Sequence, residues 1–313
     1  MKVCFIDTVH PILKERLESR GVRCVMHTST PQIELEQLIG SYDGIVIRSR
    51  IKMDKRFLSK AANLKFIARS GAGMENIDLE FCEQKGIICF NSPEGNRDAV
   101  GEQAIGMLLL LFRNILRADA QVRSGIWDRE GNRGHELSGK TVGIVGFGNM
   151  GSALASKLTG FGCRIVAYDK YKSGFATSTI EEVDLETLQS ESDVISLHLP
   201  QTEETNYYFN STFIDSCSKN FFLINTARGK NVNTEDLVAA MKKGKVLGAC
   251  LDVIEYEHSS FEKIDTNQLP EPFQYLIASD RVVLSPHIAG WTYESYVKLS
   301  SFLADKIIDC FGL

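Results

Sequence analysis

The stretch KTVGIVGFGNMGSALASKLTGFGCRIVAYD, residues 140–169, contains a short apolar strand pattern, three glycines, a helical pattern and a second strand pattern. Gly146, Gly148 and Gly151 follow the first strand pattern at GxGxxG spacing. At that spacing the first glycine permits a sharp turn, the second lets the backbone approach a pyrophosphate, and the third allows close helix–strand packing. An isolated match is weak, but the strand and helix patterns around this one predict a dinucleotide-binding fingerprint.

Two further features of the stretch indicate which ligand it binds. Asn149 and Met150 open the helical pattern, where free N–H groups and the positive end of the helix dipole favour an anion. Asp169 closes the second strand pattern. A carboxylate there can accept both ribose hydroxyls of NAD and repels the additional phosphate of NADP. The stretch therefore predicts an NAD site, and a hydride carrier implies redox chemistry.

Strand and amphipathic patterns alternate on both sides of the fingerprint. Strand-like runs before it are KVCFID, VRCVMH, GIVIRS, LKFIARS and IICFN, and strand candidates from the fingerprint onward lie near residues 142, 165, 194, 222, 248 and 283. Alternation of this kind predicts parallel sheets, and six strands are the number that a complete dinucleotide-binding fold needs. We therefore predict an α/β protein with two Rossmann-like domains, each a parallel sheet flanked by helices.

Two long helical patterns mark the expected domain boundaries. An apolar pattern covers about residues 98–123 and leads into a Gly-rich polar connector. The last pattern, about residues 292–311, has an apolar face that must pack on another element, and we expect it to return to the first domain. The expected domains are a substrate-binding, flavodoxin-like domain of residues 1–97 plus 291–313 and an NAD-binding Rossmann domain of residues 98–290.

Composition excludes several classes of partner and site. The chain has 35 basic and 40 acidic residues, so its formal charge of −5 gives no positive field for nucleic acid or anionic lipid. The N-terminal apolar run is too short for a signal peptide. Eight scattered cysteines form no CxxC pair, which predicts neither a metal site nor a disulfide framework. We expect a cytoplasmic protein.

Six segments, taken together, resemble the D-isomer-specific 2-hydroxyacid dehydrogenase family over nearly the whole chain. They are RSGAGMENID (69–78), the fingerprint with its preceding LSG (137–169), SDVISLHLPQTEET (192–205), INTARG (224–229), LGACLDVIEYE (247–257) and LSPHIAGWT (284–292), in the family's order. The resemblance is closest to D-3-phosphoglycerate dehydrogenases without a C-terminal regulatory domain, so control through such a domain is not expected. It implies a homodimer formed through the cofactor domain.

The resemblance implies a catalytic site of Arg228, Glu257 and His287. Each residue suits the chemistry of a 2-hydroxy acid, because a group that titrates near neutrality must take the hydroxyl proton as hydride leaves C2. His287 fits that role, and Glu257 on its other ring nitrogen would fix the tautomer and stabilise the protonated ring. Arg228 presents a planar fork that matches the substrate carboxylate.

The same resemblance assigns the remaining site residues. Thr226 and Ala227 would lie along the nicotinamide, Asp252 would orient its carboxamide, and His198 would line the cofactor or be structural. Further cofactor residues are Pro200, Thr205 and Gly290. The substrate loop would be Arg69, Ser70, Gly71, Ala72 and Gly73, joined by Arg48, with backbone N–H groups of residues 71–73 forming an anion nest.

Arg48 and Arg69 follow successive strand patterns and look like the arginines with which phosphoglycerate dehydrogenases meet the anionic end of their substrate. The favoured substrate is therefore D-3-phosphoglycerate, in serine biosynthesis, because two arginines suit a phosphate dianion. Arg48 also occurs in relatives that use unphosphorylated acids, so a glyoxylate or hydroxypyruvate reductase is the alternative. Formate dehydrogenase is disfavoured because Glu257 is present.

Two features leave other interpretations open. The family usually has proline after the catalytic glutamate, where this chain has His258, followed by a long connection (258–281) whose apolar residues predict a docked loop. The family also resembles NADH-binding transcriptional corepressors, which keep the same three residues without needing turnover. Turnover of a 2-oxo acid with NADH separates that binding role from an enzyme.

Overall fold

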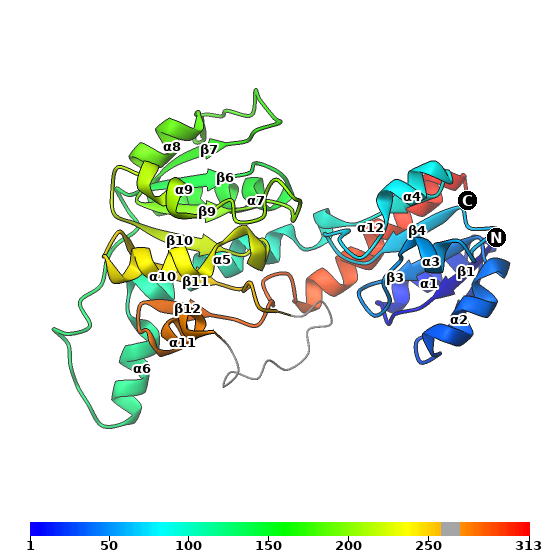
Figure 1. Ribbon diagram of the computed structural model, residues 1–313, viewed down its shortest axis with the longest axis horizontal. Coiled ribbons are helices and arrows are strands. Elements are labelled where there is room, and N and C mark those ends of the chain that lie inside the picture. Colours follow the sequence, from blue (N-terminus) through cyan, green and yellow to red (C-terminus); the bar gives the residue numbers. More distant parts are fainter. Residues whose placement is uncertain (258–269) are drawn as a thin grey trace. The chain divides into compact units, whose positions relative to one another are not determined.

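The computed structural model describes residues 1–257 and 270–313, which form two compact units (Figure 1). One unit consists of Met1–Arg97 and Trp291–Leu313, and the other of Asp98–Gly290. Each contains a parallel sheet covered by helices, as predicted from the alternation of strand and helix patterns.

The first unit has a five-stranded parallel sheet with the order β2-β1-β3-β4-β5. Its strands are β1 (Lys2–Phe5), β2 (Arg23–Met26), β3 (Gly44–Ile47), β4 (Phe66–Arg69) and β5 (Ile88–Phe90). Its helices are α1 (Pro11–Glu18), α2 (Gln32–Leu38), η1 (Ile39–Ser41), α3 (Lys55–Leu58), α4 (Leu79–Gln84), η2 (Pro93–Gly95) and α12 (Tyr293–Phe311). Every residue of the central strand β3 is buried, which is typical of a parallel strand covered on both faces.

Helix α12 packs into the core of the first unit, so the predicted return of the C-terminal helix is confirmed. Its residues Leu303 and Ile307 are fully buried beside Phe66 of β4. Thr292 and Ser295 start the helix with a reciprocal capping box, which satisfies two N–H groups at its N-terminus. The apolar face seen in the sequence therefore has a partner within the first unit.

The second unit has a seven-stranded parallel sheet with the order β12-β11-β10-β9-β6-β7-β8. Its strands are β6 (Thr141–Val145), β7 (Arg164–Tyr168), β8 (Glu181–Glu182), β9 (Val194–Leu197), β10 (Phe221–Asn225), β11 (Val246–Leu251) and β12 (Val282–Leu284). Its helices are α5 (Arg97–Phe112), α6 (Ile115–Arg123), α7 (Asn149–Leu158), η3 (Thr159–Phe161), α8 (Leu185–Glu191), α9 (Ser211–Ser216), η4 (Gly229–Asn231), α10 (Thr234–Lys242) and α11 (Glu271–Ala278). The prediction of six strands was wrong by one, because β8 is two acidic residues that pair with Val166 and Ala167 and carry no strand pattern.

The predicted helix over residues 98–123 is two helices, which is a second correction. Asn114 lies between α5 and α6 with φ of 52°, a left-handed conformation that ends the first helix and that asparagine tolerates better than most residues. The axes of α5 and α6 are bent by 60° at this break. Among the described residues no single helix has the length and apolarity to cross a membrane, whereas this bent pair meets both criteria jointly.

The connection after Glu257 is partly helical. Helix α11 occupies Glu271–Ala278 and buries Phe273 and Leu276 in the core, so this part is a packed helix where a docked loop was expected. His258 and the rest of residues 258–269 lie outside the described residues.

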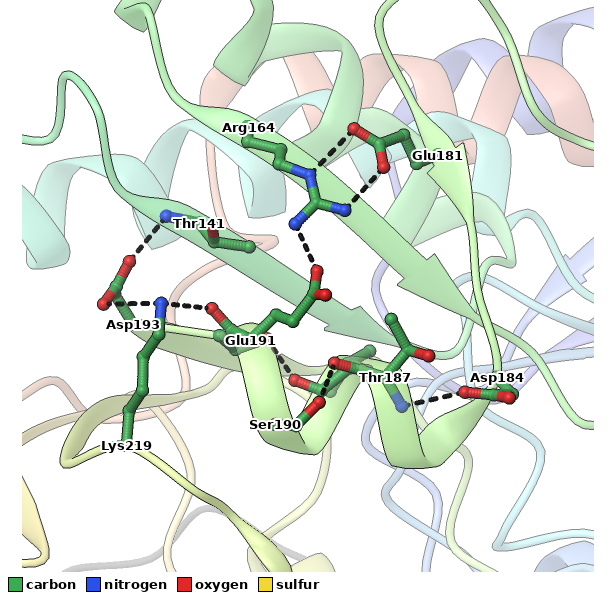
Figure 2. A network of polar contacts seen from close by, with 11 residues as sticks. Thr141, Arg164, Glu181, Asp184, Thr187, Ser190, Glu191, Asp193 and Lys219 are labelled. Atoms are coloured by element: carbon green, nitrogen blue, oxygen red, sulfur yellow. Dashed lines mark hydrogen bonds and ion pairs between the residues drawn. The ribbon is translucent and has the colours of Figure 1, made fainter.

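A network of polar contacts connects β7, β8 and α8 near one edge of the sheet of the second unit (Figure 2). Arg164 on β7 contacts Glu181 of β8, with 2.9 Å between Nε and Oε1, and also contacts Glu191 of α8. The Nζ atom of Lys219 lies 3.3 Å from Oδ1 of Asp193 and 2.7 Å from the backbone oxygen of Glu191. The network lies at the amino ends of β7 and β9, opposite to the strand ends that carry the predicted site. Exposed pairs of this kind contribute little stability each.

Candidate active site

The predicted residues of the second unit follow the carboxyl ends of neighbouring strands. Gly146 follows β6, His198 follows β9, Thr226 follows β10 and Asp252 follows β11. In an open parallel sheet these ends share one edge, and ligands bind there.

The fingerprint turn has the geometry that its glycines predict. Gly146 has φ of +92°, and a Cβ atom on it would lie 2.6 Å from the oxygen of His198. A Cβ on Gly151 would lie 2.0 Å from the oxygen of Gly146, so α7 packs on its strand more closely than any side chain would allow. A Cβ on Gly148 meets no atom within 4 Å. The turn therefore leaves space over Gly148, at the N-terminus of α7, where a pyrophosphate fits.

Asp169 organises the same turn. Its carboxylate accepts hydrogen bonds from the backbone N–H groups of Phe147 (2.7 Å), Tyr171 (2.9 Å) and Lys172 (3.0 Å). The Nζ atom of Lys172 lies 3.3 Å from the oxygen of Phe147. Because an ionised carboxylate has about four accepting positions, three backbone bonds leave capacity for a ribose hydroxyl.

Two buried polar atoms at the strand ends have no hydrogen-bond partner in the described part of the chain. They are Nδ1 of His198 and Oγ1 of Thr226. The other ring nitrogen of His198 lies 2.9 Å from Oγ of Ser196, and burial lowers the pKa of His198 to about 4, so the ring is neutral at physiological pH. Buried polar atoms are normally satisfied, so these two fit the polar groups of a bound cofactor.

His287 and Glu257 contact each other, as the sequence predicts. The Nδ1 atom of His287 lies 3.0 Å from Oε2 of Glu257, and the two side chains are 28% and 22% exposed. His287 has φ of 55°, a conformation that is rare for a residue with a side chain. Its backbone N–H donates to the oxygen of Asp252 at 2.7 Å. One ring nitrogen of His287 is thus held by a carboxylate, which fixes the orientation of the ring.

Asp252 has a structural role that the sequence did not predict. It is 1% exposed, and its carboxylate accepts hydrogen bonds from Oγ of Ser285 (2.5 Å) and from the N–H groups of Ile288 (2.9 Å) and Ala289 (2.8 Å). These bonds lie on both sides of His287. Asp252 therefore fixes the loop that carries the histidine.

Asn231 is a site residue that the motifs missed. It is fully buried, and its Nδ2 donates to the backbone oxygens of Pro200 (3.2 Å) and Thr205 (3.1 Å). Its Oδ1 accepts the backbone N–H of Arg228 at 3.1 Å. It joins the loops after β9 and β10 and so sets the position of Arg228. The sequence signal for Asn231 is its position three residues after Arg228 in TARGKN, which places both residues on a single helical turn.

The Arg228 side chain and the backbone after it are closely supported. Its Nη1 donates to the oxygen of Ala227 at 2.7 Å. A Cβ on Gly229 would lie 1.9 Å from the oxygen of Ile254, so the backbones after β10 and β11 touch at this point. The loop that carries Arg228 is thereby held against the segment that leads from β11 to Glu257.

The predicted substrate loop lies in the first unit, after β4. The N–H of Gly71 donates to the oxygen of Arg69 at 2.9 Å, so this N–H turns back into the loop and does not contribute to an anion nest. The N–H of Ser70 is likewise used, by Ile47 in the sheet. For the N–H groups of Ala72 and Gly73 the described residues provide no acceptor. The expected nest of three is therefore reduced to these two donors.

The two predicted substrate arginines of the first unit differ in their contacts. Arg69 donates from Nε to the oxygen of Arg48 at 3.0 Å and from Nη1 to the oxygen of Gly73. The guanidinium of Arg48 lies over the ring of Trp291, with 4.3 Å between Cζ and the ring centroid. Arg69 thus shapes the loop, whereas Arg48 is stacked.

Comparison with known proteins gives the family. Residues 105–289 match the model of the D-isomer specific 2-hydroxyacid dehydrogenase, NAD binding domain. The chain is 37% identical over 280 residues to hydroxypyruvate reductase of Thermotoga maritima, covering 90% of this chain and 88% of that protein. It is 33% identical over 311 residues to D-3-phosphoglycerate dehydrogenase of Archaeoglobus fulgidus, covering 99% of this chain but only 57% of that protein.

Among solved structures, D-lactate dehydrogenase from Aquifex aeolicus, complexed with NAD and lactic acid, superimposes with a TM-score of 0.82 at 29% identity. That match covers 99% of this chain and 95% of the other. The chain therefore belongs to the D-isomer specific 2-hydroxyacid dehydrogenases, a family of NAD-dependent enzymes, and its Asp98–Gly290 unit contains the NAD-binding domain of that family.

Proposed function

We propose that the protein interconverts a small D-2-hydroxy acid and its 2-oxo acid, with His287 as the acid and base. The observation that supports this most directly is the 3.0 Å contact between Nδ1 of His287 and Oε2 of Glu257 at the ligand-binding edge of the sheet. NADH held by the strand-end residues of the second unit would supply the hydride for C2 of the substrate, and NAD would accept it in the reverse direction.

The proton is handled by the side chains of the chain itself. In reduction the protonated ring of His287 donates from Nε2 to the carbonyl oxygen of the substrate, and in oxidation the neutral ring accepts the hydroxyl proton at the same atom. Glu257 accepts a hydrogen bond from Nδ1–H in both states, which fixes the tautomer and stabilises the positive charge. Arg228 binds the substrate carboxylate and the charge that develops on the reacting oxygen.

We assign the cofactor site to the strand-end residues of the second unit. Gly148 and the N-terminus of α7 would receive the pyrophosphate, Asp169 the adenosine ribose, and Thr226 with His198 the nicotinamide end. The remaining assignments from the resemblance are Gly146, Asn149, Met150, Gly151, Pro200, Thr205, Ala227, Asp252 and Gly290.

The contacts of the arginines favour hydroxypyruvate or a similarly small 2-oxo acid as the substrate. The resemblance favours phosphoglycerate, because Arg48 and Arg69 look like the arginines that meet the anionic end of that substrate and two arginines suit a dianion. In the structure two N–H groups of Arg69 donate to the carbonyls of Arg48 and Gly73, which leaves less capacity for a dianion. D-3-Phosphoglycerate remains the second candidate, because β3 and β4 pair in register and bring the two arginines to one sheet edge.

A panel of 2-oxo acids assayed with NADH tests these assignments. We expect the highest kcat/KM for hydroxypyruvate, with activity on glyoxylate, and a lower value for phosphohydroxypyruvate. The highest value for phosphohydroxypyruvate would instead support phosphoglycerate dehydrogenase. No turnover of any acid, with NADH still bound, would leave the corepressor-like binding role.

We propose that the protein is a homodimer formed through α6. None of the residues of this helix is buried, and Ile115, Leu116 and Val122 are 44%, 53% and 53% exposed. Burying such a face against a second copy removes apolar surface from water. Leu116→Glu with Val122→Glu should give a monomer in sedimentation equilibrium. Ile33→Glu, at a 71% exposed position of α2, is the matched control and should leave the assembly unchanged.

A further inference from the structure

The segment that leads from β11 to Glu257 ends in a β-turn. The N–H of Glu257 donates to the oxygen of Ile254 at 3.2 Å, which closes the turn. Glu255 and Tyr256 are its central residues, and the ring of Tyr256 makes an edge contact with Phe273 of α11 at 5.9 Å between centroids. A contact that fixes Glu255 therefore also limits where the carboxylate of Glu257 can lie.

Both oxygens of the Glu255 carboxylate accept hydrogen bonds. Oε1 accepts from the hydroxyl of Tyr207 at 2.7 Å, and Oε2 accepts from Oγ1 (2.8 Å) and the backbone N–H (3.2 Å) of Thr234. Thr234 is 5% exposed and is the first residue of α10. The carboxylate thus lies at the N-terminus of a helix, where the dipole favours a negative charge. These bonds hold the turn against α10 and against the loop after β9.

Tyr207 is itself held in place within the loop after β9. Its backbone has φ of 53°, and its N–H donates at 2.7 Å to the oxygen of Lys230, which lies two residues after Arg228. The hydrogen bond to Glu255 raises the pKa of Tyr207, so the phenol stays protonated and remains a donor. Through Tyr207 the turn before Glu257 is therefore tied to the loops after β9 and β10.

We propose that Glu255 is a positioning residue for Glu257 and, through it, for the ring of His287. The proposal rests on the proposed function, in which His287 exchanges a proton with the substrate. A displacement of about 1 Å at a reacting group can cost about a hundredfold in rate. The 3.0 Å contact between His287 and Glu257 thus needs a turn that does not shift, and Glu255 holds that turn through donors on both carboxylate oxygens.

A double-mutant cycle separates positioning from general stabilisation. Glu255→Ala should lower kcat with a 2-oxo acid and NADH about ten- to a hundredfold and leave KM within about twofold. In a chain that already carries Glu257→Ala, the same substitution should lower kcat by less than about twofold, because the residue through which Glu255 acts is gone. Equal losses of kcat in both backgrounds overturn the proposal.

A milder variant tests the same contact with the carboxylate of Glu255 retained. Tyr207→Phe removes one donor and keeps the ring, so kcat should fall about three- to tenfold with KM unchanged. Tyr208→Phe is the matched control, because its ring packs on Phe213 at 5.6 Å between centroids, and it should keep full activity. The same kcat in the Tyr207→Phe and Tyr208→Phe variants contradicts the proposal.

Nitrogen NMR of the histidine rings tests the positioning without turnover. The chain has six histidines, and the loss of one set of ring signals in His287→Ala assigns that residue. The ring nitrogen shifts of His287 report which nitrogen carries the proton, and both Glu255→Ala and Glu257→Ala should change them, whereas Tyr208→Phe should not. Shifts that stay the same in Glu255→Ala overturn the proposal. Altered shifts in a chain whose unmutated form reduces no 2-oxo acid would refute the proposed function and leave the positioning by Glu255 standing.

Discussion

The backbone of His287 shows how the site is built at the scale of single residues. Its φ of 55° costs free energy, and the buried carboxylate of Asp252 compensates with hydrogen bonds to the residues on both sides of the histidine. Glu257 then fixes the ring. His287 thus depends on Asp252, which contacts mainly the backbone around the histidine.

Removal of the His287 side chain should lower kcat by about a hundred- to ten-thousand-fold, because a positioned acid or base contributes that much. NADH binding, measured by fluorescence titration, should be nearly unchanged. His135→Gln, at an exposed histidine of the same unit, is the control and should keep full activity. A large loss with His135→Gln and a small one with His287→Ala would contradict the assignment.

Glu257→Gln should lower kcat more than it raises KM, because a neutral amide no longer stabilises the positive charge on the ring of His287 during proton transfer. A rise in KM with an unchanged kcat would contradict this role. Steady-state kinetics with a 2-oxo acid and NADH are the measurement.

Asp169 should make NADH preferred over NADPH, since a 2′-phosphate would meet a carboxylate that three backbone N–H groups hold in place. Asp169→Ser should raise kcat/KM for NADPH relative to NADH by at least about tenfold. Lys172→Met, on the same turn, is the control and should not increase the use of NADPH. Equal use of both cofactors by the unmutated protein would refute the prediction.

At the scale of elements, two close backbone approaches decide where helices lie. Gly151 allows α7 onto the fingerprint turn, and Gly95 allows α12 onto η2. A Cβ on Gly95 would lie 2.6 Å from the backbone N of Leu299, and neither backbone can move aside without disturbing the core around Leu303. The return of the last helix to the first unit therefore depends on a glycine at its docking site.

Gly95→Ala should destabilise the protein by about 1–3 kcal/mol, because the added methyl group overlaps backbone atoms. Gly106→Ala is the matched control, since Gly106 is exposed within α5 and its Cβ would meet nothing within 4 Å. That change should stabilise by about 0.5–1 kcal/mol, because glycine is unfavourable inside a helix. Urea unfolding midpoints of the two variants measure the difference.

At the scale of the whole molecule, His198, whose Nδ1 atom is buried, links stability to pH. Burial lowers the pKa of His198 from 6.5 to about 4, so between these values the unfolded chain binds a proton that the folded chain does not. Its contribution is fully present above pH 6.5 and is lost as the pH falls toward 4. A shift of this size corresponds to about 3 kcal/mol.

The free energy of unfolding, from urea titrations, should therefore fall between pH 7 and pH 4.5 more steeply in the unmutated protein than in His198→Gln. The variant should be less stable at pH 7 if its amide cannot replace the contact with Ser196, but its slope against pH should be shallower. Parallel slopes would show that His198 is not the group that titrates.

The sequence alone determined the fold class and most of the strands. Periodic apolar patterns and glycines at fixed spacing indicate the local backbone conformation and the face of an element that is buried. For this reason the fingerprint and the return of the apolar C-terminal helix were predicted correctly. Such patterns do not predict an edge strand such as β8, whose two acidic residues are extended because they pair with β7. The break at Asn114 was missed for a similar reason, because one left-handed residue in an apolar run leaves the helical period intact.

Only the tertiary structure decided which polar groups are already used. The motifs placed Arg48 and Arg69 side by side as substrate residues. In the structure hydrogen bonds to Arg48 and Gly73 make Arg69 a support of its loop, whereas the guanidinium of Arg48 stacks on Trp291. Asp252 and Asn231 likewise acquire their roles from residues far away in the sequence. A sequence pattern records the type of side chain at a position. The partner of each donor and acceptor depends on which segments the fold brings within about 3 Å, the length of a hydrogen bond.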